Sequence, residues 1–282
     1  MSYILWLASY PKSGNTWLRA FLANYLADAK KPVHINALRD FAYGDMRVEY
    51  YEKISQKRAA DLEGSEINSL RPRVHRMIAA SEPGLVFVKT HSALTQIDDV
   101  PTITPESTFG AIYVVRNPMD VAVSFAHHNG ISIDDAVQSL CLDNLYIPAA
   151  PHRIPQILTS WGNHVRTWVR APGLNLKVVR YEDMTARPNS AFGEILDLLE
   201  VPRERERLKR ALRFCSFKVL AEQEKNDGFA ERSAEADRFF RKGKTGSWRD
   251  ELSDENVRTL ISKHGEVMEE FGYLSTDGEV LV

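Results

Sequence analysis

The chain has 282 residues, which is enough to bury a substantial core as one α/β domain or as two small ones. Its hydrophobic content of 44% and charged content of 26% are typical of a soluble globular protein. A net charge of −2 argues against a general attraction to nucleic acid or membrane surfaces, so any anion-binding site must be local.

Cysteine usage and hydropathy bear on the cellular compartment. Cys141 and Cys215 are far apart in the sequence and form no metal-type pair, which favours a reducing compartment. No apolar stretch approaches the ~20 residues needed to span a bilayer, and no leader pattern precedes the first predicted strand. We therefore expect a cytoplasmic protein that binds neither membrane nor nucleic acid.

A phosphate-binding turn is predicted near the N-terminus. Residues 4–8 form an apolar run typical of a buried strand, and apolar residues recur at helical spacing from Trp17 onward. A strand, a tight turn and a helix N-terminus form a phosphate cradle, because backbone N–H groups and the helix dipole point at the anion. Lys12 adds a full charge to this turn, and Ser13 and Thr16 add hydroxyl donors.

The order of residues in this turn differs from the Walker A loop, in which lysine follows the last glycine. Here Lys12 precedes Gly14, the only glycine between Tyr10 and Trp17. A plain turn that happens to contain lysine and serine would explain the same residues. The turn by itself therefore does not decide the ligand.

The rest of the chain alternates between strand and helix patterns. Apolar runs predict strands at 85–88, 111–115 and 176–179. Asn117 and Pro118 predict a helix start, with Asn as the N-cap and Pro as the first helical residue. Further helices are expected at 49–62, 65–79, 154–169, 189–199, 203–213 and from 253 onward.

Residues 226–248 lose the apolar periodicity and accumulate Gly, Arg and Lys, which predicts a long loop of the kind that is usually either functional or disordered. Strands that alternate with helices indicate an α/β fold, with a central parallel sheet flanked by helices. No linker, repeat or low-complexity segment interrupts this pattern. We therefore expect a single domain over residues 1–282.

Polar side chains follow each predicted strand directly. Lys12 follows the first strand, Lys89 and His91 the second, Arg116 the third and Tyr181 the fourth. Core periodicity does not require polar residues at these places. Ligands of open parallel sheets bind outside the carboxyl ends of the strands, so these residues mark the expected site.

Four segments together resemble the cytosolic-type sulfotransferases that use 3′-phosphoadenosine 5′-phosphosulfate (PAPS), in particular bacterial-like members that act on small molecules. The resemblance covers most of the chain. Tyr10–Trp17 resembles the 5′-phosphosulfate loop, and Arg116 with Ser124, eight residues later, resembles the 3′-phosphate motif. Residues 241–243, Arg-Lys-Gly, are similar to the late loop that closes on the same phosphate. Residues 89–91, Lys-Thr-His, are similar to the segment that carries the catalytic histidine of the family.

This resemblance implies a P-loop-NTPase-like sulfotransferase fold and PAPS as co-substrate, without a metal. The residues that it assigns to cofactor binding are Lys12, Ser13, Gly14, Asn15, Thr16, Trp17, Arg116, Ser124, Tyr181, Phe217, Arg241, Lys242 and Gly243. Trp17, Tyr181 and Phe217 are the expected adenine contacts. Asn15 replaces a threonine that is frequent in the family, and Cys215 stands where a threonine commonly contacts the cofactor.

The resemblance also implies the catalytic roles. Lys12 would stabilise the charge that develops on the departing oxygen. His91 would act as general base, while Lys89 and Ser124 would orient the reacting groups. The expected acceptor is a phenol or an alcohol of small or medium size, with an amine as the less favoured alternative. Its pocket is expected in residues 32–51, 127–154 and 226–240.

Two alternatives stay open at this point. A P-loop kinase or NTPase is disfavoured by the position of Lys12 and by the lack of an obvious acidic magnesium ligand after a strand. A catalytically silent PAPS-binding protein is disfavoured because both Lys12 and His91 are present. The eight histidines form no ligand-spaced cluster with acidic residues, so no metal site is expected.

Overall fold

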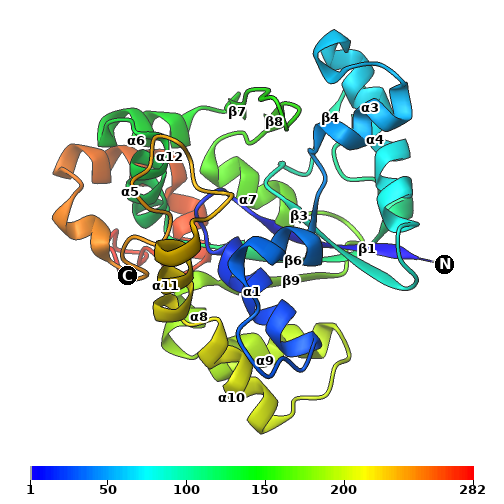
Figure 1. The fold of residues 1–282 in the computed structure, drawn as a ribbon. Helices are drawn as coiled ribbons and strands as arrows, with labels where there is room; N and C mark the ends of the chain where they lie inside the picture. The colour runs from blue at the N-terminus through cyan, green and yellow to red at the C-terminus, as the bar shows by residue number, and fades with distance from the viewer. Residues whose placement is uncertain (1) are drawn as a thin grey trace. The chain divides into compact units, whose positions relative to one another are not determined.

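The structure is a computed structural model that describes residues 2–282 (Figure 1). The strands are β1 Tyr3–Ser9, β2 Tyr43–Gly44, β3 Leu85–Thr90, β4 Gln96–Ile97, β5 Val100–Pro101, β6 Thr108–Val115, β7 Tyr146–Ile147, β8 Gln156–Ile157 and β9 Leu176–Arg180. The α-helices are α1 Asn15–Leu26, α2 Leu38–Phe41, α3 Val48–Ser55, α4 Gly64–Ala79, α5 Pro118–Asn129, α6 Ile133–Cys141, α7 Trp161–Val169, α8 Tyr181–Ala186, α9 Pro188–Leu198, α10 Arg205–Phe214, α11 Phe217–Asp227 and α12 Asp254–Glu270. The 3₁₀ helices are η1 Ile35–Ala37, η2 Ala59–Asp61, η3 Pro105–Ser107 and η4 Ser247–Asp250.

The chain divides into two compact units, each assembled from three segments. The first unit contains Met1–Tyr10, Ala42–Tyr113 and Leu142–Val178. The second contains Pro11–Phe41, Val114–Cys141 and Val179–Val282. The main sheet belongs to the first unit, apart from the last two residues of β6 and of β9.

The main sheet has five strands in the order β2-β3-β1-β6-β9 (Figure 1). β1 pairs in parallel with β3, with Ala8 opposite Thr90, and β2 pairs in parallel with β3. Residues 4–8 of β1 are completely buried, as expected for a parallel strand that is covered on both faces. Within the first unit, α4 packs against β1 and β3. The predicted α/β fold with a central parallel sheet flanked by helices is confirmed.

One predicted helix is much shorter than expected. The helix expected at 154–169 begins only at Trp161, because Pro155 disfavours helical backbone at Ile154 and Thr159 adopts a left-handed conformation with φ of 60°. Among the apolar residues before it, Ile157 belongs instead to the small antiparallel pair β7–β8. Hydrophobic spacing alone could not distinguish this hairpin from a helix.

One other boundary and one whole helix also differ from the prediction. The helix expected at 49–62 ends at Ser55, because Gln56 takes a left-handed conformation with φ of 59°, and a separate 3₁₀ turn follows at Ala59–Asp61. The helix α11 was not predicted. Its only buried residue is Leu220, so it presents no apolar stripe to detect.

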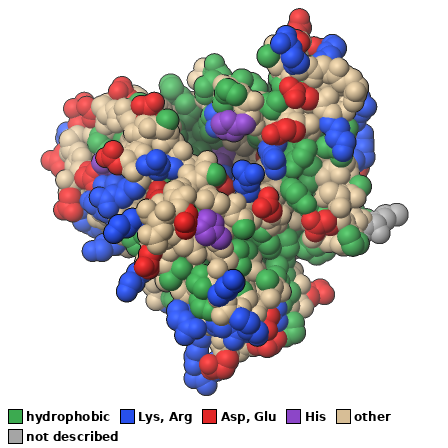
Figure 2. Space-filling model, in the orientation of Figure 1, with side chains coloured by type: hydrophobic (Ala, Val, Ile, Leu, Met, Phe, Trp, Pro, Cys, Tyr) green, Lys and Arg blue, Asp and Glu red, His purple; other side chains and the backbone are tan. Residues whose placement is uncertain are grey.

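The second unit is built mainly of helices. α1 packs against α10, and α5 and α6 pack against α12. Figure 2 shows Lys and Arg side chains gathered over α10. Two of them, Arg207 and Arg210, form ion pairs with Asp28 just after α1, so part of this positive charge ties α10 to the end of α1. Over residues 2–282, no helix is both long and apolar enough to cross a bilayer.

Candidate active site

The predicted phosphate turn has an unusual backbone. Lys12 lies in the left-handed region with φ of 68°, and Gly14 has φ of 107°. A Cβ atom at Gly14 would lie only 2.6 Å from Cδ2 of Tyr181, so this position accepts only glycine. Left-handed non-glycine residues are costly and cluster at functional sites. The turn therefore presents Lys12 and the start of α1 in a conformation that the surrounding residues impose.

The start of α1 has the properties of an anion site. The helix begins at Asn15, and no side chain within the described sequence caps its N-terminus. Asn15 and Thr16 lie in its first turn and are buried. The Ser13 side chain is 1% exposed, and its Oγ has no hydrogen-bond partner among residues 2–282. A buried hydroxyl without a partner is costly unless a ligand completes its hydrogen bonding.

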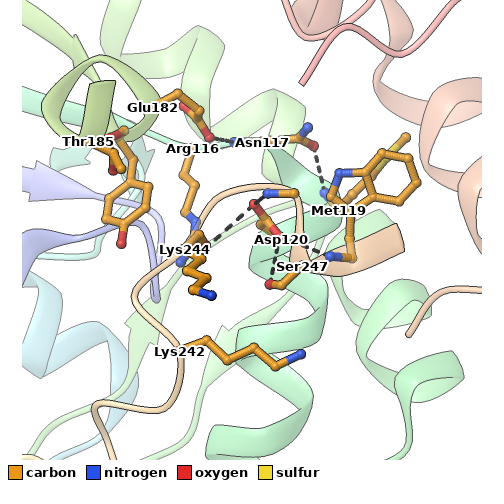
Figure 3. Close-up of polar contacts among 12 residues, drawn as sticks. Arg116, Asn117, Met119, Asp120, Glu182, Thr185, Lys242, Lys244 and Ser247 are labelled. Carbon is orange, nitrogen blue, oxygen red and sulfur yellow. Dashed lines mark hydrogen bonds and ion pairs between the residues drawn. The ribbon is translucent and has the colours of Figure 1, made fainter. Parts of the chain in front are cut away.

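Arg116 connects this turn with the late loop, and Figure 3 shows its side chain beside Lys244. Its Nη1 donates to the Lys12 carbonyl at 3.1 Å, and its Nη2 donates to the Lys244 carbonyl at 3.2 Å. The guanidinium carbon lies 4.3 Å from the centroid of the Tyr181 ring. The Arg116 Nε is buried and has no hydrogen-bond partner in the described part of the chain. Arg116 thus retains a buried donor beside two segments that were predicted to bind phosphate.

Asp120 anchors the late loop to α5. Its carboxylate accepts from the Gly246 N–H at 2.8 Å, the Ser247 hydroxyl at 3.1 Å and the Trp248 N–H at 3.2 Å (Figure 3). Its side chain is fully buried. Its partners are more than 120 residues away, so sequence pattern could not reveal this role.

Asn117 and Glu182 fix the start of α5 (Figure 3). The Asn117 side chain accepts from the Met119 N–H at 3.0 Å, which confirms the predicted N-cap. The Asn117 N–H donates to Glu182 at 3.0 Å, and the Tyr273 hydroxyl donates to the same carboxyl at 2.9 Å. Burial raises the pKa of Glu182. Ser124 lies two turns further along α5 and is half-buried.

The predicted adenine contacts occupy two places in the second unit. The Trp17 and Tyr181 rings meet edge to face, with centroids 5.8 Å apart. Phe217 is 38% exposed and lies against Gly243, where a Cβ would approach its ring to 2.2 Å. Cys215 is buried, and its Sγ donates to the Leu212 carbonyl at 3.6 Å. Burial raises the pKa of its thiol to about 12, so it is an apolar, protonated neighbour of Trp17.

The basic residues of the late loop are paired with an acid. Arg241 and Lys242 both contact Oε1 of Glu251, at 2.9 Å and 2.7 Å, and His127 contacts its Oε2 at 2.7 Å. Burial raises the pKa of Glu251, but hydrogen bonds from Lys242, His127 and Arg241 outweigh it and lower the value to about 2. Sequence reasoning assigned Arg241 and Lys242 to a phosphate and did not anticipate Glu251.

The loop of residues 226–248 also contacts Lys12. The Lys12 Nζ lies 3.8 Å from the centroid of the Phe239 ring, within the range of a cation–π contact. Nearby in the sequence, Glu231 accepts two hydrogen bonds from the buried Arg19 of α1, at 2.7 Å and 2.8 Å. Within the second unit, the structure thus brings the predicted loop 226–248 onto the phosphate turn and α1.

The candidate base belongs to the first unit, where it directly follows β3. The His91 Nδ1 lies 2.8 Å from the Ser9 carbonyl oxygen. A carbonyl can only accept, so Nδ1 carries the proton, and in the neutral ring Nε2 is the basic nitrogen. Lys89 is half-buried near the end of the same strand. The fold thus selects the tautomer that a general base using Nε2 requires.

Residues 2–282 contain no group of three or more His, Cys, Asp or Glu side chains arranged to hold a metal ion.

Comparison with known proteins identifies the family. The model of the sulfotransferase domain matches residues 4–272. The chain belongs to this family. The prediction of a sulfotransferase enzyme is therefore confirmed.

Its relatives include plant enzymes. A flavonol 3-sulfotransferase of Flaveria bidentis is 25% identical over 91% of this chain and 78% of the relative. Cytosolic sulfotransferase 12 of Arabidopsis thaliana is 26% identical over 88% of this chain and 72% of the relative.

Solved structures share the fold. Retinol dehydratase, in a complex with androsterone and the inactive cofactor PAP, has a TM-score of 0.64 at 19% identity over 99% of this chain and 82% of that chain. A mouse sulfotransferase in complex with PAP has a TM-score of 0.61 at 18% identity over 96% of this chain and 88% of that chain. The predicted sulfotransferase fold is confirmed.

Proposed function

We propose that this sulfotransferase moves a sulfuryl group from PAPS to a hydroxyl group of a small or medium organic acceptor. The observation that supports PAPS most directly is the pair of buried donors, Ser13 Oγ and Arg116 Nε, which find no partner within residues 2–282. They lie in the two segments that resemble the 5′- and 3′-phosphate motifs. Buried donors of this kind favour an anionic ligand, and PAPS carries anionic groups at both positions.

The comparisons support the same co-substrate. Two proteins with this fold were solved with PAP bound. We infer that the 5′ side is held by Lys12, Ser13, Gly14, Asn15 and Thr16, and the 3′-phosphate by Arg116, Ser124, Arg241, Lys242 and Gly243. Trp17, Tyr181 and Phe217 would contact the adenine. Since one family model spans residues 4–272, we also propose that both units act as one domain.

In this proposal, each site residue has its own role in the transfer of the sulfuryl group. PAPS supplies the sulfuryl group, whose bond to the phosphate oxygen breaks as a bond to the acceptor oxygen forms. The His91 Nε2 takes the proton of the acceptor hydroxyl, in the tautomer that the Ser9 carbonyl favours. The Lys12 ammonium stabilises the charge left on the phosphate oxygen. Lys89 and Ser124 orient the groups around it.

Aromatic surface and the plant relatives support a phenol or alcohol acceptor. Phe229, Phe239 and Phe240 pack together in the loop of residues 226–248, with ring centroids 4.8 to 5.7 Å apart. Two of the relatives are named as flavonol sulfotransferases, which act on phenolic compounds. Other relatives are named as cytosolic, which supports a cytoplasmic location for this chain as well. A screen of phenols, alcohols and amines with labelled PAPS would identify the acceptor class.

Nucleotide binding tests the co-substrate. By calorimetry without magnesium, the wild-type protein should bind PAP much more tightly than AMP. Arg116→Ala should remove most of this preference, because a charge-assisted hydrogen bond contributes about 1.5–3 kcal/mol. Ser13→Ala should weaken PAP by about 0.5–1.5 kcal/mol. The exposed Arg213 of α10 provides a matched control, and Arg213→Ala should leave the preference intact.

Three results would contradict the proposal. Equal affinity for PAP and AMP would mean that no 3′-phosphate site exists. A requirement for magnesium would favour a kinase or NTPase. Binding of PAP without turnover of any acceptor in the screen would instead indicate a silent PAPS-binding protein.

A further inference from the structure

The segment that carries His91 has no regular secondary structure of its own. β3 ends at Thr90, and residues 91–94 form neither helix nor strand. Segments of this kind are usually among the more mobile parts of a fold. A catalytic base needs the opposite property, because a displacement of about 1 Å can cost about 10²-fold in rate.

Side chains on one face of helix α7 form hydrogen bonds with the backbone of residues 91–94. His164 Nε2 lies 2.9 Å from the His91 carbonyl, and Trp168 Nε1 donates to the Ser92 carbonyl at 3.0 Å. The Thr167 hydroxyl accepts from the Leu94 N–H at 3.1 Å. Residues 164, 167 and 168 stand at helical positions i, i+3 and i+4, so they share the face that meets this segment.

The β7–β8 hairpin, which precedes α7, also forms hydrogen bonds with the backbone of this segment. The Gln156 side chain is 4% exposed, and with its amide oxygen turned toward the backbone it accepts from the His91 N–H at 3.0 Å and the Ser92 N–H at 3.1 Å. The Ala93 N–H donates to the Ile157 carbonyl at 2.9 Å. The backbone of residues 91–94 is thus held by side chains and carbonyls that come from residues 156–168.

His164 has a single hydrogen-bonding arrangement in this environment. It is completely buried, and its Nε2 must donate, because the His91 carbonyl can only accept. Its Nδ1 then accepts from the Tyr113 hydroxyl at 2.8 Å. Burial lowers the pKa of His164 to about 4, so the ring stays neutral near pH 7. Both ring nitrogens are satisfied, which locks the orientation of the imidazole.

We infer that His164 is a positioning residue for sulfuryl transfer, which holds the main chain of His91 in place through the His91 carbonyl while Tyr113 orients the His164 ring. This inference rests on the proposed role of His91 as general base. His164 acts on the position of the base and makes no contact with the reacting atoms.

A set of three variants tests the inference, with His75→Leu as the matched control. His75 is also completely buried in the first unit, burial lowers its pKa to about 3, and it hydrogen-bonds to Thr104. His164→Leu removes the donor to the His91 carbonyl, whereas His164→Gln retains an amide N–H at a similar reach. Measured quantities are kcat and KM with an alcohol acceptor, PAP affinity by calorimetry and the unfolding temperature.

We expect His164→Leu to lower kcat by about 10–100-fold with PAP affinity unchanged, and His164→Gln to recover most of this loss. His75→Leu should lower the unfolding temperature similarly and leave kcat at the wild-type level. If His164→Leu does not fold, His164→Asn replaces it, because its shorter amide cannot reach the carbonyl and should lose more turnover than Gln. Equal turnover of the Gln and Leu variants, or of the Gln and Asn variants, would overturn the inference.

A double-variant cycle separates this inference from the proposed function. In a His91→Ala background, His164→Leu should cause no further loss of kcat, because the group that it positions is already absent. Full activity of His91→Ala would overturn the role of His91 as base, and the inference with it. A strong loss in His91→Ala combined with wild-type kcat in His164→Leu would overturn the positioning role alone.

Discussion

Residues 91–94 of the first unit and the phosphate turn of the second unit each follow a strand of the same sheet, but their polar groups are satisfied differently. The backbone around His91 is hydrogen-bonded by side chains of α7 and by Gln156. In the proposed phosphate-binding region, Ser13 Oγ and Arg116 Nε are buried without a partner among residues 2–282. The protein thus orders the proposed base by itself, whereas the proposed anion site keeps buried donors available for a ligand.

This difference has an energetic consequence. A base that is held before the substrate arrives needs no reorganisation during the reaction, which favours a high rate. Buried donors without partners destabilise the free protein, and this cost is recovered when an anion binds. Substitutions around His91 should therefore change turnover, and substitutions of the unpaired donors should change affinity. Three further predictions test this division, in order of decreasing effect.

The largest effect is expected for His91→Ala. Loss of the base should lower kcat by about 10²–10⁴-fold and leave nucleotide affinity unchanged, since the substitution lies outside the phosphate-binding region. The loss should be greater for an alcohol than for an acidic phenol, whose proton is easier to remove. The measurement is kcat/KM across pH with a matched alcohol and phenol, where the wild type should show an acid limb that the variant lacks.

Two outcomes would contradict the functional difference between the His91 segment and the phosphate turn. Equal losses for the alcohol and the phenol, with the acid limb retained, would remove His91 from proton transfer. A large loss of PAP affinity in His91→Ala would mean that the two regions are not functionally separate.

A smaller effect is expected for Lys12→Ala. The backbone of the turn and the donors of Ser13 and Arg116 remain, so PAP should still bind with an affinity reduced by less than about tenfold. Turnover should fall by about 100-fold or more, because a preorganised charge at the departing oxygen is lost. Calorimetry and steady-state kinetics on the same preparation separate the two effects. If kcat is retained and only the KM for PAPS rises, Lys12 is a binding residue.

The smallest effect concerns the dependence of stability on pH, which should differ between the two units. His75 and His164 have pKa values lowered by burial to about 3 and about 4, against 6.5 for an ordinary histidine. The unfolded chain binds protons first as the pH falls, so these two residues contribute full stability above pH 6.5. That contribution declines as the pH falls from 6.5 toward about 4 for His164 and toward about 3 for His75.

Glu251 should influence the dependence of stability on pH in a lower pH range. Its pKa is lowered to about 2 from 4.5, so its contribution is present above pH 4.5 and is lost between 4.5 and 2. Denaturant unfolding of the wild type and of His75→Leu, His164→Gln and Glu251→Gln across this range tests both windows. A histidine variant that retains the full wild-type decline between pH 6.5 and 4 would show that its imidazole is not the group responsible.

Much of the fold could be predicted because its signals are local. The apolar run of residues 4–8 predicted β1, and Asn117 with Pro118 predicted the start of α5, since a strand buried on both faces and an N-cap depend on neighbouring residues only. The helix predicted at 154–169 is present only from Trp161 onward, because the apolar residues before Trp161 follow a spacing that suits both a helix and a hairpin. Pro155 was the signal that could have corrected it.

The sequence by itself determined which groups are available for the chemistry: a lysine and a glycine before a helix N-terminus, an arginine after a strand, and a histidine after another. Tertiary structure decided the state of these groups. Ser9, 82 positions from His91, sets the tautomer of this proposed base, and His164, 73 positions from His91, hydrogen-bonds to its backbone carbonyl. Hydrogen bonds between such distant residues depend on how strands and helices pack, and short-range sequence patterns carry no information about that packing.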